Sequence, residues 1–223
     1  MMIEKSTIAF LKQLSENNNK PWFDANRKTY EQARANFAEV VQSIINQLAV
    51  YDPTIGHIEA KSAIYRINRD IRFSNDKTPY KTHFGMYFTC NGKVDDRAGY
   101  YMHITPGSSF IGGGLWMPLA PDLKKIRQEI DYNLEEFKSI LENPAFVKHY
   151  KKLDDDAKYK ISRPPKGYEA DNPAIEYLKF KSFTASTTVS DKQALSADFV
   201  KNAVDIFKAL TPLNTFFNKA LAD

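Results

Sequence analysis

The period of the apolar residues changes along this chain, and that change constrains the fold more than any other feature. Over residues 6–51 the apolar side chains recur at helical spacing, which predicts two amphipathic helices. Over residues 59–116 they alternate with polar side chains, which predicts strands. Helical spacing returns over residues 118–221, apart from an alternating segment near 180–189 that predicts one returning strand. Helices at both ends therefore flank a central group of strands.

Turn signals between the strands indicate how they pair. Asn91-Gly92 and Pro106-Gly107 separate consecutive alternating segments, and such short connections favour antiparallel neighbours. We therefore predict one α+β domain over residues 1–223, with an antiparallel sheet of about five strands packed against helices from the N- and C-terminal regions. The expected strands cover residues 65–73, 84–90, 99–105, 110–116 and 180–189.

The first predicted strand is unusually rich in charge for a folding element. If residues 65–73 are extended, their side chains alternate between two faces, and only Arg69 departs from the pattern by lying on the apolar side. The apolar face would hold Tyr65, Ile67, Ile71 and Phe73, and the polar face Arg66, Asn68, Asp70 and Arg72.

Positive charge is concentrated at residues 66–83. The whole chain has a formal charge of +4, whereas this segment alone holds five Lys or Arg and two Asp side chains. Such a cluster favours a local site for a small anion over a broad nucleic-acid surface. Arginine suits that role because its planar guanidinium binds a carboxylate or phosphate through two hydrogen bonds. The candidate anion-site residues are Arg66, Arg69, Asp70, Arg72, Lys77, Tyr80, Lys81, His83, Tyr101 and His103.

Neighbouring strands would bring further side chains to the face that carries Arg66 and Arg72. His83 and His103 are candidates for proton transfer beside a ligand held by the arginines. No catalytic residue is assigned, because no serine lies in a Gly-x-Ser-x-Gly turn and Cys90 falls on the predicted buried face. Whether the protein is an enzyme therefore stays open.

Composition narrows the class of protein. A chain of 223 residues with 43% hydrophobic and 13% aromatic residues can bury a substantial core, which excludes disorder as its main state. The lone Cys90 excludes an intrachain disulfide, and the four scattered histidines indicate no metal site. We expect no cofactor, no membrane partner and a cytoplasmic location, since no apolar run approaches the length of a membrane span.

Two other functions compete with anion binding. The protein could be a nucleic-acid module in which tyrosines stack on bases, although its modest charge makes nucleic acid the less favoured partner. It could also be an interaction protein in which the Arg/Asp segment is a structural ion-pair network. Trp116 is interpreted as a core or subunit contact and residues 154–156 as solvent-facing. The oligomeric state is left open.

A longer pattern connects these residues to a known family. The pattern Arg66-x-x-Arg69-Asp70-x-Arg72-Phe73-x-x-Asp76-Lys77-x-x-Tyr80 resembles the signature of the bacterial and fungal family called domain of unknown function 2461. The resemblance implies a single cytosolic domain of about this length and brings no activity, substrate or catalytic residue with it. Further similar segments are Trp22-Phe23, Gly112-Gly113-Gly114-Leu115-Trp116, Arg163-Pro164-Pro165-Lys166-Gly167-Tyr168 and Lys181-Ser182-Phe183.

Overall fold

The computed structural model describes residues 1–93 and 96–222, in which helices flank a small sheet. The strands are β1 (Phe84–Phe88), β2 (Gly99–Ile104), β3 (Ser109–Leu115) and β4 (Phe183–Val189). The N-terminal helices are α1 (Lys5–Glu16), α2 (Lys20–Ala25), α3 (Arg27–Leu48) and α4 (Ala60–Ala63). The later helices are α5 (Ala120–Tyr132), α6 (Leu134–Glu142), α7 (Pro144–Tyr150), α8 (Ile175–Leu178), α9 (Asp191–Ala194) and α10 (Phe199–Ala220). Short 3₁₀ helices, η1 and η2, occupy Pro53–Ile55 and Ala157–Tyr159.

The strands form one antiparallel sheet in the order β1-β2-β3-β4. The first three are consecutive in the chain, whereas β4 returns after the helices α5 to α8 and pairs with β3 from Ser109↔Val189 to Leu115↔Phe183. The α+β fold and the returning strand are thus confirmed, with a sheet of four strands where about five were predicted.

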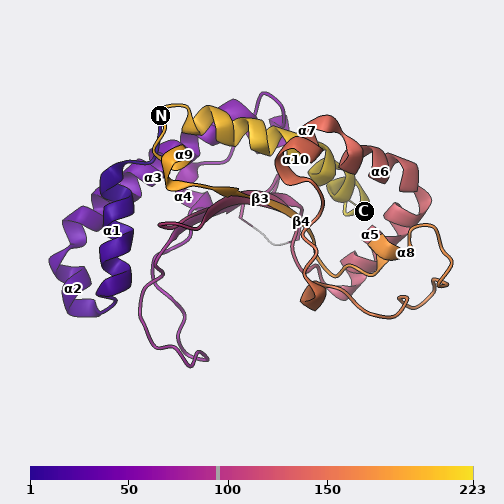
Figure 1. The fold of residues 1–223 in the computed structure, drawn as a ribbon, viewed down its shortest axis with the longest axis horizontal. Helices are drawn as coiled ribbons and strands as arrows, with labels where there is room; N and C mark the ends of the chain where they lie inside the picture. The colour runs from indigo at the N-terminus through magenta and orange to yellow at the C-terminus, as the bar shows by residue number, and fades with distance from the viewer. Residues whose placement is uncertain (94–95, 223) are drawn as a thin grey trace.

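Helices cover one face of this sheet. Figure 1 shows an arched sheet with α10 lying across its convex side and α3 beside it. Apolar residues at helical spacing turn one side of α10 toward the sheet, and Phe207 there meets Tyr100 of β2 edge to face at 5.5 Å between ring centroids. The Tyr100 hydroxyl donates to Asp52 at 2.8 Å and lies 3.0 Å from the Thr211 hydroxyl. These contacts join the N-terminal region, the sheet and the last helix into one core.

The N-terminal zone contains one more break than predicted. The expected second helix is divided into α2 and α3 at Asn26, whose backbone is not helical (φ −107°, ψ 16°). The Asn26 side-chain amide donates to the carbonyl of Trp22 at 2.9 Å. A short polar side chain that bonds a nearby backbone group in this way competes with helix continuation, which explains the break.

The segment predicted as the first strand is not part of the sheet. Residues 65–83 form an arm that extends from the edge of the sheet, on the side opposite α10 (Figure 1). Its two sides are joined by a few backbone bonds, including Lys81 N to Ile67 O at 2.8 Å and Arg69 N to Pro79 O at 2.9 Å. Pro79 has no N–H to donate, and turn-forming residues follow Ile71, so a regular ladder does not develop.

The expected burial of this segment is therefore partly wrong. Ile67 at the base of the arm is buried, but Phe73 near its tip is 95% exposed. Within the described chain, no helix or strand packs against the tip of the arm. The alternating pattern there therefore buries neither of its two faces. None of the helices in the described ranges has the length and apolar character needed to cross a membrane.

Candidate functional site

The face of the sheet opposite α10 carries aromatic and polar side chains. Strand register places corresponding residues of the four strands side by side on this open face. Every second residue points to it, whereas the intervening ones, such as Met86 and Met102, are completely buried on the helical side. Two adjacent rows on the open face are Tyr87, Tyr101, Gly112 and Ser186, and Gly85, His103, Phe110 and Thr188.

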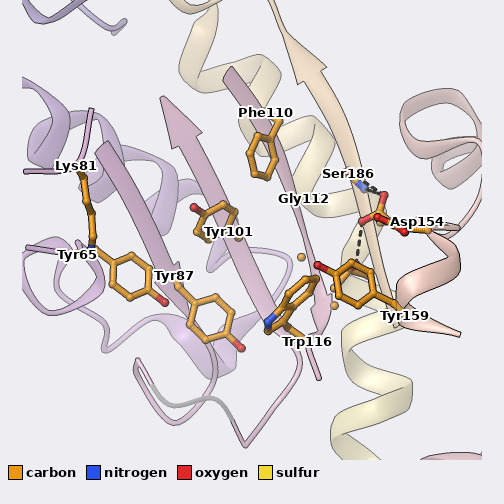
Figure 2. Close-up of a pocket in the computed structure, with 15 residues that line it drawn as sticks. Tyr65, Lys81, Tyr87, Tyr101, Phe110, Gly112, Trp116, Asp154, Tyr159 and Ser186 are labelled. Carbon is orange, nitrogen blue, oxygen red and sulfur yellow. Dashed lines mark hydrogen bonds between the residues drawn. The ribbon is translucent and has the colours of Figure 1, made fainter. Parts of the chain in front are cut away.

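A pocket of about 630 Å³ opens on this face. Its volume lies within the range of about 300–1,000 Å³ that is usual for small-molecule sites. Figure 2 shows Lys81 and Tyr65 at one end, Asp154 and Ser186 at the other, and Tyr101 between them. Six aromatic side chains supply most of the wall: Tyr65, Tyr87, Tyr101, Phe110, Trp116 and Tyr159.

Glycines give the pocket a floor of bare backbone. A Cβ on Gly112 would lie 2.4 Å from the carbonyl oxygen of Ala185, and one on Gly114 would lie 2.2 Å from that of Phe183. Gly114 also has a φ of +107°, which other residues rarely adopt. Close approach of β4 to β3 therefore requires glycine here, and the missing side chains leave open space between the aromatic walls.

The end of the pocket nearest the arm is cationic. Lys81 lies in the returning side of the arm, and its ammonium is 5.1 Å from the centre of the Tyr65 ring. Lys93 approaches the same ring at 3.8 Å and also donates to the carbonyl of Ile64 at 2.9 Å. Burial, and then the nearby Arg66, lower the pKa of Lys81. In the described chain no carboxylate forms an ion pair with Lys81.

The opposite end is acidic, but its charges are held by local partners. Asp154 accepts hydrogen bonds from the backbone N–H and hydroxyl of Ser186, at 3.1 and 2.8 Å, and from the Thr184 hydroxyl at 2.8 Å. Asp156 forms an ion pair with Lys158 at 2.7 Å, which holds the pKa of Asp156 below its usual value. These bonds fix the segment before η2 against β4 and position the pocket wall.

Tyr159 and Trp116 close this end from two different segments. Their rings meet edge to face, with 4.7 Å between centroids. Trp116 follows β3 directly and is 49% exposed, so it is not a core residue. The sequence does not single out Phe110, Tyr159 or Ser186; the polar residues on alternate positions of β4 are the one signal that this face is open.

Two histidines lie beside the pocket. The rings of His83 and His103 stack with 4.0 Å between centroids, and the Tyr101 hydroxyl is 3.0 Å from Nδ1 of His103. Burial, then His103 and Lys81, lower the pKa of His83 to about 4, and burial also lowers the pKa of His103. Burial raises the pKa of Tyr101 to about 12. The lowered pKa values of both histidines favour uncharged imidazoles at neutral pH. The Tyr101 hydroxyl and His103 Nδ1 share one hydrogen bond, whose donor is set by the tautomer of His103.

Two of the three arginines predicted to converge on a ligand, Arg69 and Arg72, are bound to internal partners. Arg69 donates to Asp76 at 2.5 Å, to the carbonyl of Thr78 at 3.0 Å and to the Thr78 hydroxyl. Arg72 binds Asp70 through two nitrogens at 2.7 and 3.0 Å, which lowers the pKa of Asp70. Both pairs lie within the arm, so the charge of these arginines is already compensated.

The remaining predicted residues have separate environments. Lys77 donates to the carbonyl of Ile71 at 3.0 Å. Tyr80 is buried and stacks on Phe23 at 4.0 Å between centroids. Arg66 is exposed near Lys81. Of the ten predicted residues, the structure brings only Lys81 and Tyr101 to the pocket wall, with His83 and His103 behind Tyr101.

We examined whether the described His, Cys, Asp and Glu side chains could form a metal centre. Within the described ranges, no group of three or more His, Cys, Asp or Glu side chains is placed to hold an ion. The pocket wall therefore offers aromatic surface, one ammonium, hydroxyls and two carboxylates that are held by local partners.

The fold and the pocket together define a class: an α+β protein with a ligand-sized aromatic pocket on the uncovered face of a four-stranded antiparallel sheet. The chain belongs to the family described as conserved hypothetical protein (DUF2461), whose model matches residues 6–216. Neither the search of curated proteins nor that of solved structures finds a match.

Proposed function

We propose that this protein binds a small anionic aromatic ligand, with a carboxylate or phosphate, in the pocket on the open face. One observation carries the proposal: six aromatic side chains and the Lys81 ammonium line the same pocket. In the described chain this ammonium has no carboxylate partner and contacts the Tyr65 ring. The sequence suggested an anion site in the same segment, and the geometry supports Lys81 and Tyr101 as its pocket-facing members.

The charge of the ligand follows from the balance of the lining residues. Lys81, Asp154 and Asp156 are the charged side chains of the pocket wall. Asp154 is held by three hydrogen bonds and Asp156 by Lys158, whereas Lys81 has the face of the Tyr65 ring. A half-buried ammonium gains most from an anion, because the pair is only partly screened by water. The ligand's negative group is therefore placed at Lys81.

The shape of the ligand follows from the rings and the glycine floor. Tyr87 and Tyr101 lie in adjacent strands over backbone that has no side chains at Gly112 and Gly114. A planar group can lie on that floor and contact ring faces and edges, each such aromatic contact contributing about 0.5–1.5 kcal/mol. At the far end, the Ser186 and Thr184 hydroxyls donate to Asp154, so their oxygens can accept hydrogen bonds from a polar substituent.

A thermal-shift screen tests this function. The panel contains aromatic carboxylates, aromatic phosphates and nucleoside monophosphates, together with the uncharged analogue of each ring. We expect stabilisation by anionic members only, its loss in Lys81→Met, and its persistence in Arg72→Ala, whose charge is already paired with Asp70. Equal stabilisation of wild type and Lys81→Met by every hit would show that the anion binds elsewhere.

Nucleic-acid binding remains the second candidate, supported by the row of aromatic side chains on an open sheet. The acidic residues at one end of the pocket count against a long polyanion crossing it. Single-stranded RNA and DNA therefore belong in the same screen at low salt, and binding that falls steeply with salt would favour this alternative. The proposal includes the cytoplasmic location expected from the sequence, which cell fractionation would check.

A further inference from the structure

The end of the pocket away from Lys81 presents hydrogen-bond acceptors. Oδ1 of Asp154 accepts from the backbone N–H and the hydroxyl of Ser186, at 3.1 and 2.8 Å, and Oδ2 accepts from the Thr184 hydroxyl at 2.8 Å. Since both hydroxyls donate to Asp154, their oxygens face a ligand as acceptors. A carboxylate offers about four acceptor positions, and these three bonds leave one of them open at Oδ2. A ligand must therefore bring donors to this end.

Asp154 also lacks the cation that each of its acidic neighbours has. Lys160 forms an ion pair with Asp155 at 2.6 Å, and Lys158 forms one with Asp156 at 2.7 Å. In the described ranges no Lys, Arg or His forms an ion pair with Asp154, whose three bonds all come from uncharged groups. A donor that carries partial or full positive charge therefore gains the most at this position.

The strand register places these acceptors beside the glycine floor. Gly112 pairs with Ser186, and Gly114 pairs with Thr184. Neighbouring strands lie about 4.8 Å apart, so a flat ring on the glycines has one edge within reach of both hydroxyls. Tyr101 pairs with Gly112 from the other side and contributes an aromatic wall there. The pocket can thus hold a planar ring and bind its edge.

The pocket is elongated, with Lys81 and Asp154 at its two ends (Figure 2). Asp154 contacts β4, whereas Lys81 belongs to the arm, whose first residue, Tyr65, bonds to β1. These are the outermost strands of the sheet, so three strand spacings, or about 14 Å, separate them. A base, a ribose and a phosphate joined in line provide a ligand with an edge of donors at one end and negative charge at the other.

We infer that the ligand is a guanine nucleotide and that Asp154 is the residue that selects its base. Guanine carries two adjacent donors, N1–H and the 2-amino group, which match the open position of Asp154 and the hydroxyl oxygens of Ser186 and Thr184. Adenine places a ring-nitrogen acceptor beside its amino group, so it presents one mismatched atom to the same set. The inference rests on the proposed function, because the phosphate is placed at Lys81. It narrows the ligand from any aromatic anion to a nucleotide with one base.

Guanosine 5′-monophosphate (GMP) and inosine 5′-monophosphate (IMP) test this inference, because they differ only in the 2-amino group. Calorimetric titration of the full-length protein measures the Kd of each. We expect GMP to bind about tenfold or more tightly than IMP, since a hydrogen bond to a charged acceptor is lost with that group. Adenosine 5′-monophosphate should also bind more weakly than GMP.

Asp154→Asn removes the charge and replaces the open acceptor with a donor. The asparagine oxygen can still accept from the N–H and hydroxyl of Ser186, so the segment should stay attached to β4. We expect this variant to bind GMP and IMP with equal affinity. Asp156→Asn is the matched control, since it removes one negative charge from the same segment at a position already paired with Lys158, and it should keep the preference for GMP. The comparison of GMP with IMP on wild type decides the inference even where Asp154→Asn lowers stability.

Failure of this inference differs from failure of the proposed function. 4-(Hydroxymethyl)benzoate, an aromatic anion without a base, reports on the anion site alone. Equal affinity of wild type for GMP and IMP would overturn the selection of guanine, and loss of both in Lys81→Met would leave the anion pocket supported. Binding of 4-(hydroxymethyl)benzoate without any nucleotide would have the same meaning. A loss of preference in Asp156→Asn as large as in Asp154→Asn would overturn the role of Asp154. No binding of any of these anions would overturn both proposals.

Discussion

At the scale of single residues, the site depends on glycines of β3 as much as on the side chains that line the pocket. A Cβ on Gly113 would lie 2.1 Å from the carbonyl oxygen of Gly99 and 2.7 Å from Leu210 of α10. Neither neighbour can yield easily, since one is backbone and the other is buried in the core. We expect Gly113→Ala to lower the free energy of unfolding by about 2–3 kcal/mol, as overpacked cores do.

Urea denaturation of Gly113→Ala and Gly56→Ala checks this prediction. Gly56 has a right-handed backbone (φ −61°), and a Cβ there would make only ordinary contacts at 3.5 and 3.7 Å. The control should therefore stay within about 0.5 kcal/mol of wild type. Similar losses in both variants would contradict the close approach of β2 and β3 described above.

The stacked histidines predict a specific dependence of stability on pH. His83 has a pKa of about 4 in the fold, against an ordinary value near 6.5. The unfolded chain thus binds the proton more readily, so the contribution of His83 is complete above about pH 6.5 and is lost as the pH falls toward 4. His83→Phe keeps a ring for stacking and should flatten the stability curve between these values.

Thermal unfolding from pH 4 to pH 8 measures that difference. The exposed His57 is the control position, and His57→Phe should follow the wild-type curve. If His83→Phe loses stability on acidification as steeply as wild type, the titrating group lies elsewhere.

The sequence predicted those site residues that belong to a local pattern, and it missed those that only the fold brings together. Lys81 and Tyr101 were predicted because one lies in the basic segment and the other alternates along a strand. Phe110, Tyr159 and Ser186 were missed, since they come from segments far apart in the chain and only the sheet register brings them together. The sequence could not decide whether Arg69 and Arg72 bind a ligand or form internal ion pairs, because a basic cluster with two acids is compatible with both.

At the scale of elements, the arm of residues 65–83 decides how the cationic end of the pocket is held. Asn18, between α1 and α2, fastens its base: the Asn18 amide donates to the carbonyl of Tyr80 at 2.8 Å, and its oxygen accepts from the N–H of Tyr80 at 3.1 Å. Tyr80 precedes Lys81 directly, so these two bonds position the ammonium that lines the pocket.

We expect Asn18→Ala to free the base of the arm at a cost of about 1–2 kcal/mol, the usual contribution of two such hydrogen bonds. Amide exchange at Arg69 and Lys81, whose N–H groups bond across the arm, should accelerate while the sheet amides stay protected. Hydrogen-exchange mass spectrometry reports both. Arg72→Ala removes an exposed pair near the tip and should leave the base protected; uniform acceleration in both variants would argue against a separate role for Asn18.

The error in predicting this element has a physical origin. Alternation over residues 65–73 is typical of a strand, and it does hold at the base, where Ile67 is buried. A segment becomes part of a sheet only if another strand pairs with it and another layer buries its apolar face. Both depend on residues outside this nine-residue pattern. The break between α2 and α3 was missed for a similar reason, since it depends on the bond that the Asn26 side chain makes.

At the scale of the whole molecule, one core joins segments from both ends of the chain. Ile3 is fully buried and its N–H bonds to the carbonyl of Ala194, while Phe207 of α10 packs on Tyr100 of the sheet. The layered α+β architecture was predictable because hydrophobic periods of helix and strand differ clearly over long segments. The strand order was not, because the position of β4 depends on contacts between distant residues.

This single core predicts cooperative unfolding. Phe207→Ala should lower the free energy of unfolding by about 3–5 kcal/mol, the usual cost of removing a buried aromatic ring. The loss should fall on helix and sheet together, so transitions followed by far-ultraviolet circular dichroism and by tryptophan fluorescence should coincide in wild type and variant. Separate transitions for the two probes would show that the layers unfold independently.

The central claim is that the open-face pocket binds an anionic aromatic ligand, and the two tryptophans of the chain provide its most direct test. Trp116 lines the pocket, whereas Trp22 packs on Phe10 among the N-terminal helices. In a ¹⁵N-labelled protein titrated with 4-(hydroxymethyl)benzoate or the best anionic hit of the screen, we expect the indole N–H signal of Trp116 to shift with saturation and that of Trp22 to stay in place. Lys81→Met should abolish the shift. A ligand that binds wild type and Lys81→Met equally, without moving the Trp116 signal, would contradict the account.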